Sequence, residues 1–227
     1  MLIRRHALRA AFTSLVPLAL LGVLTGPADA AGAGWPEPAP VITRVETKAP
    51  VVFITIDDGW THDAAAAKLL LERHVPASLF LLPGAYSYDA GYFHQFLDQG
   101  PSRVENHTVD HPDLRQLDEA GQRAQICGAR DADLAEFGDS PRLMRPPFGF
   151  WDETTRTVAR ACGAKAVVGW THDLTTWTET PAMPELKAGD IILLHFTGGL
   201  EQDLRRVLDA AGAAGLKPAP LRDYIRD

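Results

Sequence analysis

Two adjacent aspartates end the apolar stretch "VVFITIDDGW" at residues 51–60. Carboxylates at the end of a buried strand repel each other and resist losing water, so Asp57 and Asp58 need a compensating positive charge. The stretch "NHTVDH" places His107 and His111 four residues apart, a spacing that puts both rings on one face of a helical turn. Two histidines and one carboxylate form a common zinc or iron site with open positions.

A divalent ion at such a site would compensate the paired acids. Either Asp57 or Asp58 can supply the carboxylate ligand, and the other is then placed beside the activated water, where a general base belongs. Each pattern taken alone has a plainer interpretation. The histidines could be a solvated surface pair, and the aspartates before Gly59 could form an ordinary turn.

The elements that must position these residues alternate between strand and helix. Strands are expected at 51–57, 77–83, 103–107, 142–148, 164–170 and 190–196, and helices at 63–74, 89–99, 118–138, 152–162 and 201–215. Asp63 and Asp118 are expected to cap their helices. This alternation predicts a parallel sheet covered by helices, and about seven such strands could close into a barrel.

The polar residues coincide with the ends of the expected strands. Asp57 and Asp58 end the first, His107 follows the third, Arg145 ends the fourth and His195 ends the sixth. Trp170 to Asp173 follow the fifth. Parallel barrels and open α/β sheets keep their active sites at the carboxyl ends of their strands. Arg145 alone could be an ordinary salt-bridging residue, and His195 alone a core histidine, but their shared position favours one site.

Composition narrows the function classes. The 227 residues are 46% hydrophobic and 22% charged, as in a folded globular chain. The formal net charge of −7 gives no basic surface for nucleic acid or an anionic membrane.

The first thirty residues are typical of an export signal. Arg4, Arg5 and Arg9 precede an uncharged stretch, and "ADA" ends at Ala30 as a cleavage pattern. We therefore expect a signal peptide at 1–30, with an uncleaved anchor as the alternative, and no stable membrane insertion after cleavage. Residues 31–48 are rich in Ala, Gly and Pro and are expected to be a linker to a single catalytic domain at 49–227. In an oxidising compartment Cys127 and Cys162 either pair or remain two buried thiols.

Five motifs, in order, resemble those of the polysaccharide deacetylases, the family with the chitooligosaccharide deacetylase homology domain. They are "TIDDG", "HTVDH", "RPPFG", "WTHDLTTW" and "ILLH". The resemblance covers roughly residues 50–222. It implies a distorted (β/α) barrel with about seven parallel strands in a single domain.

The resemblance also implies a role for each matching residue. Asp57 would be the catalytic base, Asp58, His107 and His111 the metal ligands, and His195 the general acid. Arg145 would hold Asp57 ionised and oriented, and the backbone amide of Phe148 would bind the oxyanion. Ile192 and Leu194 would line the pocket for the acetyl methyl, and Trp177 would contact the substrate.

Three positions depart from the family pattern. Glu105 stands where the family often has Gly, and Phe148 replaces a frequent Tyr. The fourth family motif usually ends Asp-Trp, and that Asp orients the general acid. Here the pair is Thr176-Trp177, while Asp173 lies three residues earlier. Either Asp173 or Thr176 is therefore expected to support His195.

The sequence thus predicts an exported, metal-dependent deacetylase. It would remove N-acetyl groups from a β-linked amino-sugar polymer of the peptidoglycan or chitin type, using one divalent ion, with zinc the first choice. The protein would be secreted or cell-wall associated. An acetyl-xylan-type esterase of the same fold and a non-catalytic glycan-binding relative are the alternatives.

Overall fold

Parallel strands form the framework of the protein, for which a computed structural model describes residues 37–226. The strands are β1 (Val41–Ile42), β2 (Val51–Asp58), β3 (Ala77–Leu81), β4 (Arg103–Asn106), β5 (Leu143–Met144), β6 (Ala166–Val168), β7 (His172–Asp173), β8 (Ile191–His195) and β9 (Lys217–Pro218). They lie in the order β1-β6-β5-β4-β3-β2-β8-β7, and β9 pairs with the start of β2. The predicted signal peptide at 1–30 lies outside the described residues.

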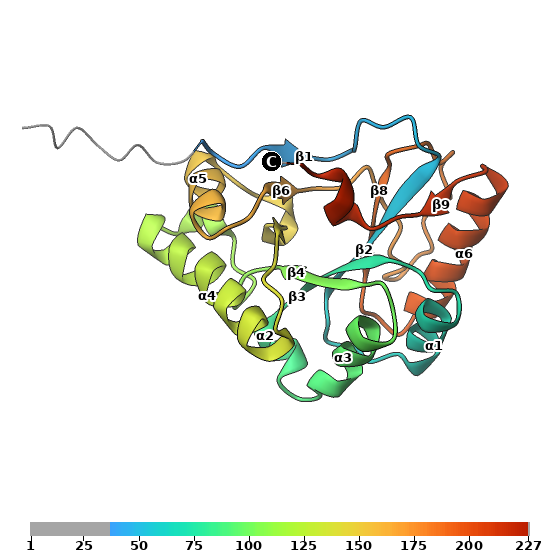
Figure 1. Ribbon diagram of the computed structural model, residues 1–227, viewed down its shortest axis with the longest axis horizontal. Helices are drawn as coiled ribbons and strands as arrows, with labels where there is room; N and C mark the ends of the chain where they lie inside the picture. Colours follow the sequence, from blue (N-terminus) through green and yellow to red (C-terminus); the bar gives the residue numbers. More distant parts are fainter. Residues whose placement is uncertain (1–36, 227) are drawn as a thin grey trace, which may run out of the picture. The chain divides into compact units, whose positions relative to one another are not determined.

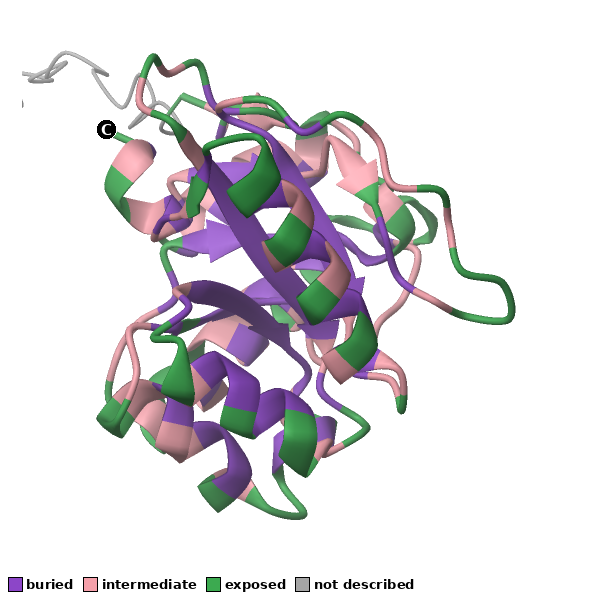
Figure 2. Ribbon diagram, turned by 90° about the vertical axis from the view of Figure 1, so that its right-hand side faces the viewer, coloured by how far each residue is buried: buried purple, intermediate pink, exposed green. Residues whose placement is uncertain are grey.

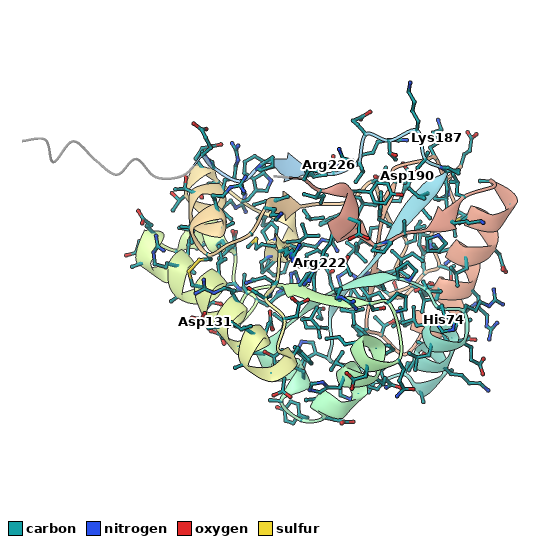
Figure 3. All side chains as sticks on the ribbon, viewed as in Figure 1. His74, Asp131, Lys187, Asp190, Arg222 and Arg226 are labelled. Carbon is teal, nitrogen blue, oxygen red and sulfur yellow. A yellow bond between two sulfur atoms is a disulfide. The ribbon has the colours of Figure 1, made fainter. Side chains whose placement is uncertain are left out.

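The sheet curls so that its two edges approach each other (Figure 1). At the gap, the Thr171 hydroxyl donates to the Thr43 carbonyl at 2.8 Å. Arg44 also pairs with the carboxylate of Asp190, labelled in Figure 3, at 2.9 Å. The result is a curled half-barrel of parallel strands, which confirms the predicted α/β barrel-like fold.

Three short strands, β1, β7 and β9, extend the predicted set. β1 falls within the stretch expected to be a linker, pairs with β6, and follows a buried Ala39. β7 pairs with β8. Each has only two residues, which is too short for an alternating pattern to be read from sequence.

The helices are α1 (Ala64–Glu72), α2 (Pro83–Tyr86), α3 (Ala90–Asp98), α4 (Glu119–Phe137), α5 (Glu153–Ala161) and α6 (Leu200–Ala213), with short 3-10 turns at Leu114–Gln116, Pro147–Gly149 and Leu221–Tyr224. Five of the helices match the predicted segments closely, whereas α2 was not predicted and begins at Pro83, which was expected to end a strand. Asp63 and Asp118 cap α1 and α4 as predicted, because their carboxylates accept from free amides of the first turn. In Figure 1, α4 and α5 pack side by side, as do α1 and α6.

The core explains how β2 delivers an aspartate to the site. Strand β2 is buried along nearly its whole length, and buried residues are purple in Figure 2. Successive side chains point to opposite faces. Ile54 and Ile56 pack in the apolar cluster that includes residues of α1, α3 and α6, while Phe53 packs in a second cluster with residues of β3, β5, β6 and β8. Asp57 shares the face of Phe53, so it points into the curl of the sheet.

The departure at Glu105 has a structural explanation. Its side chain is fully buried in β4, and one carboxylate oxygen accepts from the backbone amides of Arg142 and Leu143, both at 2.9 Å. The other oxygen pairs with Arg222, labelled in Figure 3, which also donates to the Val104 carbonyl at 2.6 Å. A buried charge is tolerated when it is paired and hydrogen-bonded. Glu105 therefore fastens the C-terminal segment to the sheet.

Candidate active site

The predicted chemical residues gather around one cavity of about 390 Å³ at the carboxyl ends of the strands. Its lining comprises Asp57, Asp58, His107, His111, Pro146, Phe148, Trp170, Asp173, Trp177, Leu193 and His195. Arg145 lies beneath this lining, and Ile192 and Leu194 are not part of it. The cavity brings acids, histidines and aromatic side chains from six strand ends into one place.

Asp58, His107 and His111 form a group suited to a metal ion. One ligand atom from each lies within 4.8 Å of the others. Oδ1 of Asp58 is 3.4 Å from Nε2 of His107 and 3.6 Å from Nε2 of His111. That oxygen is buried and has no hydrogen-bond partner among the described residues. A buried oxygen without a donor is costly, and a divalent cation would satisfy it, so the residues fit the metal that the motifs imply.

The electrostatics favour an ionised Asp58 and a neutral His111, whereas for His107 burial lowers the pKa and the carboxylates of Asp57 and Asp58 raise it by more. Burial raises the pKa of Asp58, but the interaction with His107 and the charges of the other histidines outweigh this effect, so the net pKa lies below the ordinary value. Burial and then the charge of His107 lower the pKa of His111. A carboxylate that stays ionised and an imidazole that stays neutral are the forms that bind metals.

A non-helical turn, rather than the predicted helical turn, brings the two histidines together. Thr108 and His111 have positive φ angles of 69° and 59°. Side chains hold this turn, because Asn106 Oδ1 accepts from the Thr108 amide at 3.0 Å and Thr108 Oγ1 accepts from the His111 amide at 3.2 Å. Such backbone strain is concentrated at functional sites.

A backbone carbonyl fixes the ring of His107. Nδ1 of His107 lies 2.9 Å from the carbonyl oxygen of Arg145. Because a carbonyl only accepts, Nδ1 carries the proton and Nε2 is left to face Asp58.

Asp57 occupies a different environment from its neighbour. It is 2% exposed, and its Oδ1 accepts from Nη1 of Arg145 at 2.6 Å. The same Nη1 donates to Thr55 Oγ1 at 2.8 Å, and Nε and Nη2 donate to the carbonyls of Val168 and Gly169. A guanidinium locked by four acceptors therefore orients Asp57 at the edge of the histidine group. This arrangement assigns the two adjacent carboxylates to separate partners.

Thr175, which the sequence analysis missed, holds His195. Its hydroxyl lies 2.8 Å from Nδ1 of His195, and the ring of Trp177 lies 4.7 Å from the imidazole. Neither Asp173 nor Thr176 makes the expected contact. Asp173 instead accepts from the Thr175 amide at 3.1 Å, so it braces the residue that touches the histidine.

The acetyl-pocket prediction is corrected by the alternation of β8. Ile192 and Leu194 are fully buried in the cluster that packs with the helices, whereas Leu193 and His195 line the cavity. Residues two apart on a strand share a face, so Leu193 is the apolar wall beside His195. Phe148 lies on the opposite rim with a positive φ of 61°, its ring 4.7 Å from that of His111.

Comparison with known proteins agrees with this arrangement. A family profile described as polysaccharide deacetylase matches residues 44–167, which is more than half of the chain. The chain belongs to the polysaccharide deacetylase family. It is 37% identical to an uncharacterised protein of Streptomyces coelicolor, over 93% of this chain and 94% of that protein. It is 30% identical to a chitooligosaccharide deacetylase of Sinorhizobium fredii, over 68% of this chain and 75% of that protein.

A solved structure also matches this chain in fold. A protein of Bacillus anthracis described as a pseudoenzyme of the CE4 family superposes with a TM-score of 0.72 at 20% identity. The superposition covers 83% of this chain and 69% of that one. At this identity the match concerns the fold alone.

Thr176, which departs from the family pattern, binds a buried acid on another element. Its amide and hydroxyl donate to the two carboxylate oxygens of Asp203 in α6, at 2.7 and 2.5 Å. Asp203 is 1% exposed and also pairs with Arg206 at 3.1 Å. Helix α6 follows β8, the strand that ends at His195. Asp203 therefore links the segment of Thr175 and Thr176, which contacts the His195 ring, to the strand and helix that carry His195.

Proposed function

We propose that this protein is an exported, metal-dependent deacetylase that hydrolyses N-acetyl groups of a β-linked amino-sugar polymer of the peptidoglycan or chitin type. The observation that carries the proposal is that two adjacent carboxylates have different partners at one cavity. Asp58 joins His107 and His111, while Asp57 is held by Arg145 at the same cavity, and His195 stands on a neighbouring strand. The S. fredii relative, a chitooligosaccharide deacetylase, supports this substrate class.

Asp58, His107 and His111 would hold the ion. When bound, a divalent cation supplies positive charge that polarises the acetyl carbonyl and a water molecule. Two histidines and one carboxylate suit zinc, which is our first choice.

The chain's own residues account for the proton transfers. Asp57 takes a proton from the water as the water oxygen attacks the acetyl carbon, and Arg145 holds the carboxylate in position. The backbone amide of Phe148 donates to the oxyanion. Nε2 of His195 gives a proton to the leaving nitrogen, since an amide nitrogen leaves poorly without one. Trp177 and Leu193 bound the space beside that nitrogen. The products are acetate and a free amine on the sugar.

Export is part of the proposal. The sequence of residues 1–30 has the features of a signal peptide. The bridge between Cys127 and Cys162 supports an oxidising destination, because disulfides persist outside the cytosol. No helix within residues 37–226 has the length and apolar character to cross a membrane. An enzyme that is secreted or associated with the cell wall would meet its polymer outside the cytosol.

The test is acetate release from N-acetylglucosamine oligomers, peptidoglycan and acetyl-xylan, with and without a chelator. We expect release from the amino-sugar substrates, loss with chelator and return with added zinc. Release from acetyl-xylan alone would favour the esterase alternative. Binding of the glycans without any acetate release would favour the non-catalytic alternative, against which the complete set Asp57, Asp58, His107, His111 and His195 argues.

A further inference from the structure

A second cavity lies at the end of the strands opposite the candidate active site. It has a volume of about 330 Å³ and is lined by the amino ends of β3 and β4, the residue before β5 and the C-terminal 3-10 turn. Its polar lining residues are Ser78, Arg103, Asp139, Arg142, Arg222 and Asp223. It shares no lining residue with the active-site cavity. Parallel sheets carry out chemistry at the carboxyl ends of their strands, so deacetylation does not account for this cavity.

The register of the sheet turns part of this lining into the curl. Ser78 of β3 pairs with Arg103 of β4, and two positions further along Phe80 pairs with Glu105. Residues two apart on a strand share a face. Phe80 packs with Phe53 in the cluster on the inner face of the sheet, and Glu105 is fully buried. The cavity is therefore the amino-end mouth of the curled sheet, and Arg103 stands at this opening.

One arginine of the lining is fully engaged by the fold. Nε of Arg222 pairs with the buried Glu105, Nη1 donates to Asp139 at 2.5 Å, and Nη2 donates to the Val104 carbonyl at 2.6 Å. The Arg222 side chain is only 9% exposed. Because two carboxylates compensate its charge, Arg222 forms a fixed wall of the cavity rather than a group that is open to a ligand.

Three other charged side chains of the lining have no ion-pair partner within residues 37–226. Arg103 and Arg142 pair with no carboxylate, and Asp223 pairs with no cationic group. Nη1 of Arg103 donates to the Ser102 carbonyl at 2.6 Å, which leaves most of its N–H donors open. Arg103, Arg142 and Asp223 are all exposed. Charges of both signs thus line one cavity without pairing with each other, and they are available to a ligand.

The two kinds of available charge define the ligand. A guanidinium presents paired donors that fit the two oxygens of a carboxylate, and Asp223 offers acceptor oxygens for an ammonium group. A plain anion would be attracted by the arginines but repelled by Asp223 and Asp139, whereas a ligand with both charges avoids this conflict. The volume is at the small end of the range for ligand sites, which suits a molecule of the size of an amino acid or a dipeptide.

We propose that the amino-end cavity binds an amino-acid zwitterion, either a free amino acid or a dipeptide. Its carboxylate lies against Arg103 and Arg142, and its ammonium group lies against Asp223. This inference goes beyond the proposed function, because the cavity is remote from the deacetylation site and shares none of its residues.

Calorimetric titration of the full chain with alanine and alanylalanine, which carry both charges, tests the proposal. N-acetylalanylalanine lacks the ammonium group, alanylalanine amide lacks the carboxylate, and inorganic phosphate is a plain anion. Each of these three should bind at least about tenfold more weakly than the better of the two zwitterions, the cost of one lost charged hydrogen bond. Comparison of alanine with alanylalanine decides between a free amino acid and a dipeptide.

Variants locate the binding at this cavity. Arg142→Gln should lower the affinity for the better zwitterion about tenfold and should bind the amide form nearly as well as the zwitterion. Asp223→Asn should lower the affinity by a similar factor and should no longer discriminate against the N-acetyl form. Arg73→Gln and Asp209→Asn are changes of the same types at exposed positions outside the cavity, and they should keep the wild-type affinity.

Absence of binding by both alanine and alanylalanine, or equal binding of the two capped forms, would overturn the proposal without any variant. Phosphate binding as tight as that of the zwitterion would make the cavity a plain anion site and would refute it too. Affinities of Arg142→Gln and Asp223→Asn that match those of the two control variants would place the binding elsewhere on the molecule. None of these measurements depends on acetate release, so the deacetylase proposal stands or fails separately.

Discussion

Asp57 and Asp58 are adjacent in sequence, yet the end of the strand separates their roles. Asp57 keeps the alternation of β2 and meets Arg145 inside the sheet. Asp58 has a positive φ of 75°, which turns its carboxylate toward His107 and His111. The left-handed backbone is costly for a residue with a Cβ, and the site retains it.

We therefore predict opposite results for two isosteric changes. Asp57→Asn removes the proton acceptor but no ligand, so the protein should keep its metal and lose at least about a hundredfold in kcat. Asp58→Asn removes a charged ligand and should lose most bound metal as well as activity. Elemental analysis of both purified variants, combined with acetate release, measures this. Metal loss in Asp57→Asn with retention in Asp58→Asn would reverse the two assignments.

Our second prediction concerns Thr175, because it is the one residue among those described that hydrogen-bonds to the His195 ring. Its hydroxyl can accept from the protonated ring but carries no charge. Thr175→Val should lower kcat about tenfold, the cost of one hydrogen bond, and move the alkaline limb of the kcat–pH profile to lower pH. Thr175→Ser should restore both.

Thr178→Val, a change at a nearby exposed threonine, is the control and should leave the profile in place. Thr176→Asp, in contrast, would set a second carboxylate against Asp203 rather than against His195. A Thr175→Val enzyme with the wild-type alkaline limb would show that His195 is not held through this hydroxyl.

At the residue level, the sequence locates the site residues whose positions follow from a motif or from the alternation of side chains along a strand. It does not locate those whose positions depend on the conformation of a loop. Leu193 was accessible from sequence, because it lies two residues before His195 on a strand and must share its face. Thr175 was not, because its contact depends on how Asp173 and Asp203 brace a segment without regular structure.

At the scale of elements, the capped helices were predictable and the short irregular pieces were not. Helix α4 begins after Asp118 and ends at Gly138, whose φ is 69°, and both signals are visible in the sequence. The turn from His107 to His111 was predicted to be helical, because a spacing of four residues is shared by helices and by other tight turns. Only the side-chain bonds from Asn106 and Thr108 distinguish the two.

A buried carboxyl between two helices gives a pH prediction. Asp133 of α4 is 0% exposed, its Oδ1 accepts from the Tyr86 hydroxyl of α2 at 3.0 Å, and its Oδ2 has no hydrogen-bond partner within residues 37–226. Burial raises its pKa well above the ordinary value of 3.8. The folded state thus holds this proton more tightly than the unfolded state, and stability falls as pH rises from the unfolded toward the folded pKa.

Asp133→Asn removes this titration while keeping the shape. From pH 5 to pH 8 the free energy of unfolding of the variant should therefore increase relative to that of the wild type, which means that the variant becomes relatively more stable. Urea denaturation at the two pH values measures this. Asp131→Asn, at an exposed position on the same helix labelled in Figure 3, should show little such change. If the Asp133→Asn difference is the same at both pH values, Asp133 does not titrate with folding.

At the scale of the whole molecule, the alternation of strands and helices predicted the architecture, and the shared strand ends predicted where the site would form. Contacts that close the fold were beyond sequence reasoning. The Glu105–Arg222 pair joins residues 117 positions apart, and Arg44–Asp190 spans the open seam of the sheet. No local pattern encodes such partners, since each depends on the completed curl of the sheet.

The disulfide is one long-range link that the sequence offered as an alternative, and the structure pairs Cys127 of α4 with Cys162 at the end of α5. The bridge closes a segment of 35 residues that carries Arg145 and Phe148 but none of the three metal-site residues. A chain-entropy estimate for a loop of this length gives about 3–4 kcal/mol of stability.

The double variant Cys127→Ser/Cys162→Ser should accordingly lose about 3–4 kcal/mol in its free energy of unfolding. Wild type treated with reductant is the matched control and should lose a similar amount. Below the unfolding transition, metal content should fall only slightly, because Asp58, His107 and His111 are carried by β2, β4 and the turn after β4, although the Arg145 carbonyl that fixes the His107 ring lies in the bridged segment. Activity should fall more than metal content, because Arg145 and Phe148 lie in the released segment. Two free thiols in the unreduced, denatured wild type would contradict the bridge itself, and extensive metal loss in the double variant would show that the segment also supports the ligands.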